Sequence, residues 1–96
     1  MPPLRKFVVV IEDDESLRRA LERQLRAAGY RCESFAAAEE FLLVAAICKA
    51  SCVLCDINLD GMTGLEFALH PKVTELNLPV VLMSGSADPL IEIPAR

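Results

Sequence analysis

The chain has 96 residues, at the low end of the single-domain range, so we expect one domain over residues 1–96 with one core. Its hydrophobic residues (53%) and charged residues (25%) exclude a disordered chain and favour elements that are buried on more than one face. The net charge of -4 and the scattered basic residues argue against a nucleic-acid-binding surface, which needs clustered Lys and Arg.

Neither a membrane span nor a secretion signal is evident. No stretch reaches the ~18 uninterrupted apolar residues of a spanning helix, and the first residues run directly into a strand-like segment. We therefore expect a cytoplasmic protein with no membrane partner, and reduced thiols at the four cysteines, which are Cys32, Cys48, Cys52 and Cys55.

The first third of the chain predicts a strand, a helix and a second strand. Residues 6–11 form a continuous apolar run, typical of a strand that is covered on both faces. Apolar residues then recur at helical spacing over residues 15–28, with Asp14 or Ser16 as the cap and Gly29 as the stop. Residues 31–35 alternate polar and apolar and predict a short edge strand.

The rest of the chain continues this alternation. Residues 37–49 are rich in helix formers, and residues 51–57 form a third, buried strand. A helix over residues 64–70 is expected to stop or kink at Pro71, and residues 80–83 form a fourth strand. Asp88 and Pro89 then resemble the cap and first turn of another helix.

Strands that alternate with helices predict an α/β fold, a doubly wound parallel sheet. With the strand order 2-1-3-4, the first and third strands are neighbours. Ligands of such sheets bind at the carboxyl ends of the strands. The residues that follow each strand are therefore the candidates for function.

Acidic residues follow two of these strands. Glu12 and Asp13 follow the first, Asp56 ends the third, and Ser84 follows the fourth. Carboxylates that converge repel one another, and a divalent cation such as Mg²⁺ offsets that repulsion. Beside the metal, Asp56 can act as a nucleophile toward phosphorus, and Ser84 can donate a hydrogen bond to a phosphoryl oxygen. Taken alone, each acid has a structural explanation as a helix start, cap or turn residue.

Four segments, residues 8–19, 28–30, 55–64 and 78–85, resemble the receiver domain of two-component response regulators. They run through nearly the whole chain. The resemblance implies a flavodoxin-like receiver fold and a signalling domain rather than an enzyme. It implies that a sensor histidine kinase or a phosphotransfer protein donates the phosphoryl group, and that any output domain lies outside this chain.

The resemblance also assigns roles to individual positions. Asp56 matches the phosphoacceptor, and Ser84 matches the hydroxyl residue that moves toward the phosphoryl group. Glu12 and Asp13 match the acidic pair that binds Mg²⁺, and Asn58 matches the residue whose backbone carbonyl completes the metal site.

The sequence departs from the family in two places. Asp60 stands where proline is frequent, which adds charge near the site and is expected to loosen the turn. The chain also reaches Arg96 before the family's fifth strand, with its lysine, and fifth helix, and no other lysine matches that position. We therefore expect an incomplete domain with impaired coupling to an output. An open edge at residues 80–83, with uncovered faces on the first strand and helix, would favour a homodimer.

Other readings are weaker. An aspartyl phosphatase would carry a second Asp as general acid where this chain has Asn58, and a nucleotide binder would carry a Gly-rich loop after the first strand. A CxxC pair on a strand points its thiols to opposite faces, so Cys52 and Cys55 predict core packing rather than redox or zinc chemistry. A receiver-like interaction module that works without phosphate remains the alternative.

Overall fold

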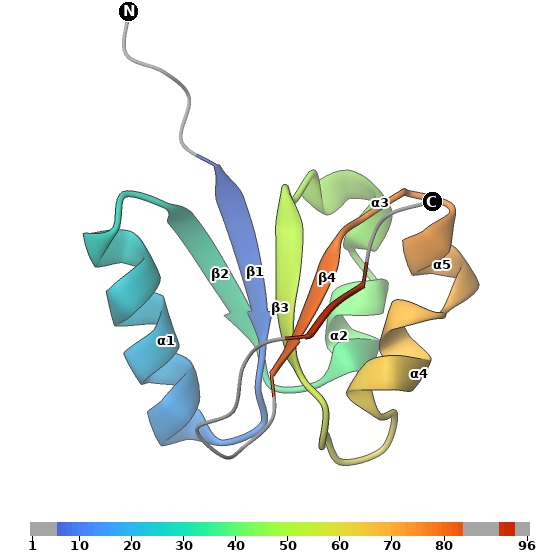
Figure 1. Ribbon diagram of the computed structural model, residues 1–96, viewed down its shortest axis with the longest axis horizontal. Helices are drawn as coiled ribbons and strands as arrows, with labels where there is room; N and C mark the ends of the chain where they lie inside the picture. The colour runs from blue at the N-terminus through green and yellow to red at the C-terminus, as the bar shows by residue number, and fades with distance from the viewer. Residues whose placement is uncertain (1–5, 84–90, 94–96) are drawn as a thin grey trace, which may run out of the picture.

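The computed structural model describes residues 6–83 and 91–93. These residues form a central sheet with helices on both faces (Figure 1). The elements in chain order are β1 (Phe7–Ile11), α1 (Glu15–Ala27), β2 (Arg31–Phe35), α2 (Ala38–Leu42), α3 (Ala45–Cys48), β3 (Cys52–Asp56), α4 (Gly64–Ala68), α5 (Pro71–Thr74), β4 (Val80–Met83) and β5 (Ile91–Ile93).

The sheet has the order β2-β1-β3-β4-β5. The first four of these strands are parallel, which confirms the predicted doubly wound α/β sheet with the order 2-1-3-4. Ile11 is paired with Cys55, and Asp56 is paired with Met83. The carboxyl ends of β1, β3 and β4 therefore lie at one edge of the sheet.

Helix α1 covers one face of the sheet, and α2 to α5 cover the other (Figure 1). The main core lies on the α2–α5 face, where Phe41 packs edge to face against Phe35 and Phe67 with ring centroids 5.5 and 5.8 Å apart. On the strands, Val53 and Cys55 belong to this core, whereas Cys52 is half-buried outside it. The two thiols therefore lie on opposite faces, as predicted.

One predicted helix is divided in the structure, and another is shorter than expected. The helix expected over residues 37–49 breaks at Val44, whose φ of -119° and ψ of 6° are not helical. Val44 is β-branched, a type that loses side-chain freedom in helices, and its side chain packs against the core. The helix expected over residues 64–70 ends at Ala68, before Pro71, and Pro71 is the first residue of a separate short helix, α5. His70 caps α5, because its Nδ1 accepts a hydrogen bond from the Lys72 N–H at 3.1 Å.

The expected open edge at residues 80–83 is wrong. Strand β5 pairs with β4 in the antiparallel direction, with Val80 opposite Ile93 and Leu82 opposite Ile91. The main-chain groups of β4 therefore find partners on both sides. Asp88 and Pro89, which predicted another helix, lie outside the described residues.

The expected exposure of the first strand is also wrong, because all five residues of β1 are buried. Helix α1 does have an uncovered side: none of its residues is buried, and Leu17 is 43% exposed. Its cap is Asp14, as predicted, and Gly29 adopts a φ of +97°, which glycine tolerates and other residues rarely do. Among the described residues, no helix has the length and apolar character needed to cross a membrane.

Candidate functional site

Glu12 leaves β1 into a buried position at the carboxyl edge of the sheet. Its N–H donates to the Phe35 carbonyl of β2 at 3.0 Å, so the main chain stays in the sheet pattern for one residue beyond β1. Its side chain is only 2% exposed, and its Oε2 accepts the N–H of Asp14 at 3.1 Å. The Arg18 guanidinium donates to the Glu12 carbonyl at 2.9 Å. Hydrogen bonds to its main chain and to its carboxyl group thus both hold Glu12 in place.

Asp56 is held in the same way at the end of β3. Its Oδ1 accepts the N–H of Asn58 at 3.0 Å, and the following residue, Ile57, donates its N–H to the Met83 carbonyl at 2.9 Å. Asp56 is 8% exposed. Asp56 is therefore largely shielded from solvent, and the turn that follows orients its carboxylate.

Gly64, the first residue of α4, packs directly against Asp56. A Cβ at this position would fall on the carbonyl oxygen of Asp56 and 2.9 Å from the Cα of Ile57. Both are backbone atoms that cannot swing aside. Glycine is therefore required here for the close approach of the helix to the site.

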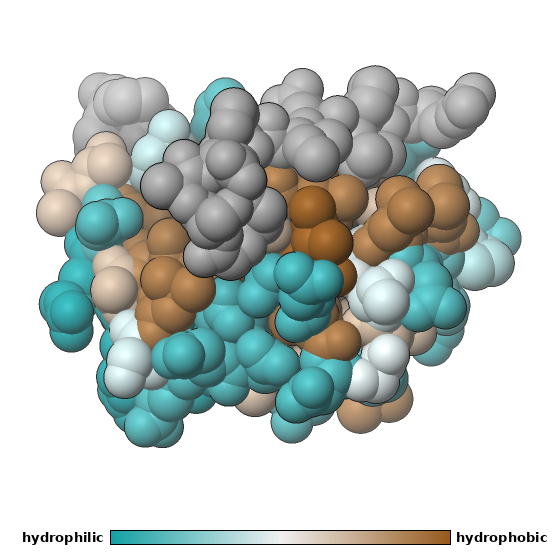
Figure 2. All heavy atoms as spheres, turned by 60° about the horizontal axis from the view of Figure 1, so that its bottom comes forward, coloured by the Kyte–Doolittle hydropathy of each residue, from teal (hydrophilic) through white to brown (hydrophobic). Residues whose placement is uncertain are grey.

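Three carboxyl groups converge at this edge. Ligand oxygens of Glu12, Asp13 and Asp56 all lie within 4.8 Å of one another, with Glu12 and Asp56 buried and Asp13 exposed. Figure 2 turns this end of the molecule forward and shows hydrophilic residues gathered across it. The structure therefore brings together the three acidic residues that the sequence singled out.

The cluster perturbs the ionisation of Glu12, whose pKa is raised to about 7. Burial of the carboxyl group is the largest cause, and the hydrogen bond from the Asp14 N–H opposes it. A side-chain hydrogen bond with Asp13 and the negative charge of Asp56 raise the pKa further. The site is thus short of positive charge, which is the condition that favours a bound cation.

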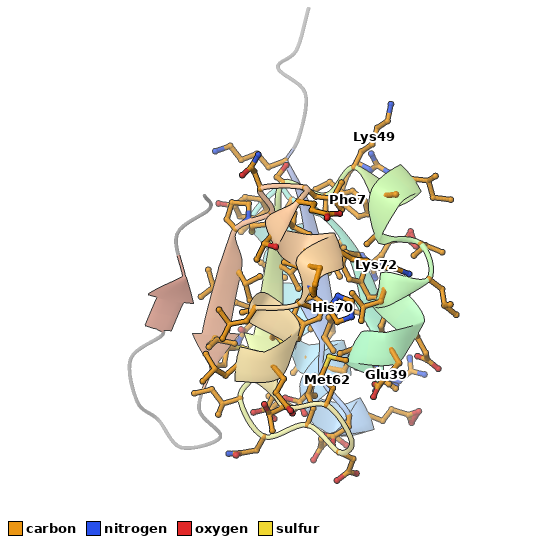
Figure 3. All side chains as sticks on the ribbon, turned by 90° about the vertical axis from the view of Figure 1, so that its right-hand side faces the viewer. Phe7, Glu39, Lys49, Met62, His70 and Lys72 are labelled. Atoms are coloured by element: carbon orange, nitrogen blue, oxygen red, sulfur yellow. The ribbon has the colours of Figure 1, made fainter. Side chains whose placement is uncertain are left out.

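Two backbone amides hold the loop after Asp56, one to the acidic cluster and one to α2. The Asp60 N–H donates to Asp13 Oδ2 at 3.3 Å, and the Met62 N–H donates to Glu39 Oε2 at 3.3 Å. Proline at position 60 would have no such N–H, so the departure from the family at this position adds a contact to Asp13. Figure 3 shows Glu39 and Met62 together at this end of the molecule.

Sequence reasoning gave no role to Glu39 or Gly64. Glu39 lies in the first turn of α2, the helix that follows β2. Its place shortly after the end of a strand could have indicated that it lies near the site. The requirement at Gly64 comes from a contact between backbones, which has no signature in the sequence.

Of the other predicted site residues, Asn58 is exposed and touches the site through its N–H, and Ser84 lies outside the described residues. All three lysines are described. Lys6 precedes β1, Lys49 follows α3 at the opposite end of the molecule from Met62, and Lys72 lies in the first turn of α5 (Figure 3). None of them follows a described strand at the carboxyl edge.

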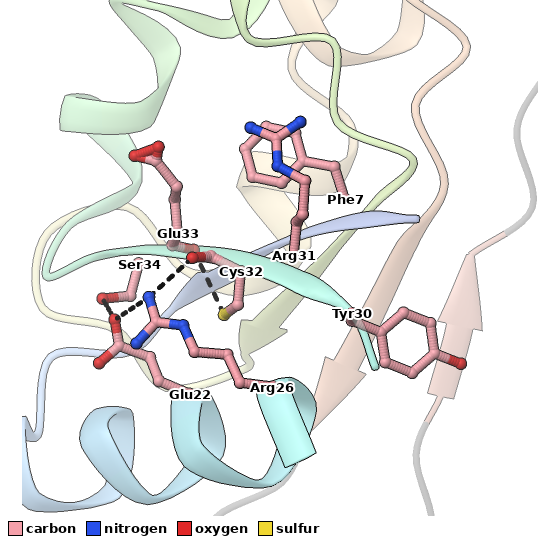
Figure 4. A pocket seen from close by; sticks show the side chains of 8 residues that line it. All are labelled: Phe7, Glu22, Arg26, Tyr30, Arg31, Cys32, Glu33 and Ser34. Atoms are coloured by element: carbon pink, nitrogen blue, oxygen red, sulfur yellow. Dashed lines mark hydrogen bonds and ion pairs between the residues drawn. The ribbon is translucent and has the colours of Figure 1, made fainter. Parts of the chain in front are cut away.

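A hollow of about 620 Å³ lies elsewhere, between α1 and β2 (Figure 4). Three of its charged side chains already have partners: Arg26 donates to the Cys32 carbonyl at 2.9 Å and lies 4.0 Å from Glu22, and the Arg31 guanidinium lies 4.7 Å from the centroid of the Phe7 ring. The acidic cluster is therefore the better candidate for a site.

Comparison with known proteins agrees with the geometry. Residues 8–93 match the response regulator receiver domain family. The chain is 40% identical over 83 residues to the C4-dicarboxylate transport transcriptional regulatory protein DctD of Rhizobium meliloti, covering 84% of this chain and 18% of that protein. It is 30% identical over 84 residues to nodulation protein W of Bradyrhizobium diazoefficiens, covering 88% of this chain and 37% of that protein.

A solved structure has the same fold. A response regulator receiver protein from Pseudomonas putida superposes with a TM-score of 0.77 at 25% identity, over 91% of this chain and 74% of that one. The chain spans well under half the length of the two curated relatives, 18% and 37%. The functions of those whole proteins therefore cannot be assigned to this chain from the match alone.

Proposed function

We propose that this chain, which belongs to the response regulator receiver domain family, accepts a phosphoryl group on Asp56 beside a Mg²⁺ ion. The observation that carries the proposal is the convergence of the carboxyl groups of Glu12, Asp13 and Asp56 within 4.8 Å. Two-component signalling through this acceptor is consistent with the family and with the relatives that it matches.

The donor set fits magnesium. Mg²⁺ is a hard cation that takes oxygen ligands and retains several waters, and here three carboxylates offer oxygens at one edge of the sheet. Glu12, Asp13 and Asp56 would hold the ion together with the backbone carbonyl of Asn58. When bound, the ion would neutralise charge on the transferring phosphoryl group.

Asp56 is placed to act as the nucleophile. The hydrogen bond from the Asn58 N–H to Oδ1 orients its carboxylate, and Gly64 leaves room for α4 to pack behind it. In the proposed step a carboxylate oxygen of Asp56 bonds to the phosphorus of a phosphohistidine while the P–N bond breaks. The imidazole leaves with the bonding electron pair and takes a proton from solvent.

Ser84 is the proposed hydrogen-bond donor to the transferred group. Asp56 is paired with Met83 in the sheet, so β4 ends at the edge where Asp56 lies, and Ser84 is the next residue of the sequence. A hydroxyl there would reach the phosphoryl oxygens from the side opposite Glu12 and Asp13.

The proposed phosphoryl donor is a sensor histidine kinase or a phosphotransfer protein, and the proposed location is the cytoplasm, as the family resemblance implies. The domain is a signalling domain, and we propose no catalysis beyond its own phosphorylation and dephosphorylation. The two curated relatives are longer proteins, so an output domain outside this chain is part of the proposal.

One observation favours a second candidate, a receiver-like interaction module that works without phosphate. No lysine follows a described strand at the carboxyl edge, so among the described residues the site lacks a cation to bind a phosphoryl oxygen. The two candidates differ in a single property, which is whether Asp56 gains a phosphoryl group.

Intact mass measured after incubation with acetyl phosphate and Mg²⁺ separates these candidates. We expect wild type and Asp14→Asn, which alters an acid outside the cluster, to gain one phosphoryl group. We expect Asp56→Asn to gain none and Asp13→Ala to gain far less, because it lacks a metal ligand. Failure of wild type to gain mass at any Mg²⁺ concentration would leave the interaction module as the better account.

A further inference from the structure

The helical face formed by α2 to α5 carries most of the exposed apolar side chains. Of the large hydrophobic residues that are exposed in the described part of the chain, five belong to this face: Leu43, Ile47, Leu65, Leu69 and Leu76. Leu43, just after α2, is 81% exposed, and Ile47, in α3, is 77% exposed. Such a concentration of apolar surface marks a site of interaction.

A groove lies within this face, between the α2–α3 segment and α5. It encloses about 200 Å³ and is lined by Leu42, Leu43, Ala45, Ala46, Lys72, Glu75 and Leu76. Figure 3 looks onto this side of the molecule, with Lys72 between the two pairs of helices. The volume is below the roughly 300 to 1,000 Å³ of small-molecule sites, so apolar side chains of a protein suit it better.

The face combines a protruding apolar side chain with small ones. Leu43 is largely exposed, and the groove that it lines also contains the small side chains of Ala45 and Ala46, so a second copy can place its Leu43 against them. The groove also carries one positive charge, Lys72, and one negative charge, Glu75. When two copies meet about a two-fold axis, each Lys72 can face the other copy's Glu75, although the whole chain has a net charge of -4.

We infer that a second copy of this chain docks on this face, forming a two-fold symmetric dimer through the α2–α3 segment and α5. The edge of β4, which the sequence predicted to be open, is not available for self-association. Strand β5 already occupies the edge of β4, and on the β2 edge the Cys32 carbonyl is taken by Arg26 (Figure 4). This assignment replaces the dimer by strand pairing that the sequence suggested.

Sedimentation velocity over a range of concentrations tests the inference. We expect metal-free, unphosphorylated wild type to form a dimer with a dissociation constant at or below about 100 μM. Leu43→Glu should weaken it by at least about tenfold, because it places a charge in the contact. Leu17→Glu is the matched control: it changes an exposed leucine of α1, on the other face of the sheet, and should leave the dimer intact.

Exchanging the two charges of the groove provides a second test of the inference. Lys72→Glu and Glu75→Lys alone should each weaken the dimer, since each sets like charges against each other, and the double variant should restore it. Circular dichroism confirms that each variant is folded. A monomer at every concentration overturns the inference, as does a dimer that Leu43→Glu leaves unchanged. Because neither Mg²⁺ nor phosphate is present, the result is independent of the proposed phosphoryl transfer.

Discussion

At the scale of single residues, Glu12 has the most perturbed ionisation in the described site. It is 2% exposed, faces Asp13 and Asp56, and has a pKa raised to about 7. The sequence predicted its position, because an acid directly after a buried strand must lie at the carboxyl edge. The degree of burial could not be predicted, since it depends on how the Asp13 loop and the Asp60 turn close over the edge.

The raised pKa of Glu12 predicts a pH dependence in the metal-free protein. Because the carboxyl group in the folded protein binds its proton more tightly than in the unfolded chain, where its pKa has the ordinary value of 4.5, its contribution to stability falls as pH rises from about 4.5 to 7. Glu12→Gln removes this titration. We expect the variant to be more stable than wild type at pH 8 by up to about 3 kcal/mol and to differ little at pH 4.

Urea denaturation of both proteins over that pH range measures the difference directly. Subtracting one curve from the other cancels the groups that the two proteins share. A difference that stays constant with pH would contradict the assigned shift. Added Mg²⁺ should reverse the order at pH 8, because wild type would then bind a cation with a carboxylate that the variant lacks.

At the scale of elements, the strands were predicted more accurately than the helices. β2 and β4 have the predicted bounds, and β1 and β3 are shorter than predicted by one or two residues. The apolar runs of β1 and β3 show in the sequence itself, and most of their residues are buried in the structure. The helix expected over residues 37–49 failed because Val44 turns into the core, a tertiary contact that outweighs the helix preference of its neighbours.

The start of α4 provides a test of how an element positions the site. Gly64→Ala would place a Cβ against the backbone of Asp56 and Ile57, so either the helix or the acceptor must move. We expect a loss of about 1 to 3 kcal/mol in the free energy of unfolding, as for other overpacked positions. We also expect weaker Mg²⁺ binding, because Asp56 shifts relative to Glu12.

Chemical denaturation and a Mg²⁺ titration by NMR measure the two effects. Leu65→Ala, the next residue of α4, is the control, because its side chain is 51% exposed. The control should change both quantities far less. Equal effects of the two substitutions would show that the close packing at Gly64 has no special role.

At the scale of the whole molecule, the sheet explains how residues from distant parts of the chain form one site. Parallel pairing of β1 with β3 and of β3 with β4 places Glu12, Asp56 and the end of β4 at one edge. This much followed from the alternation of strands and helices. The antiparallel β5 could not be predicted, because no short-range pattern of residues 91–93 fixes the direction of pairing.

A site made from separate strands should couple metal binding to global stability. Because an unfolded chain does not hold Glu12, Asp13 and Asp56 together, Mg²⁺ binds the folded state and stabilises it, by about 2.7 kcal/mol at 100 times its dissociation constant. Thermal unfolding with and without Mg²⁺ measures the effect. Asp13→Asn should abolish it and Asp14→Asn should retain it; equal stabilisation of both variants would place the ion elsewhere.

The identity of the phosphorylated residue is the most direct test of the account. After incubation with acetyl phosphate and Mg²⁺, borohydride reduces an aspartyl phosphate to homoserine, which peptide mass spectrometry locates in the chain. The account predicts homoserine at position 56 and nowhere else. Homoserine at another acidic residue, or none at all in a protein that binds Mg²⁺, would contradict it.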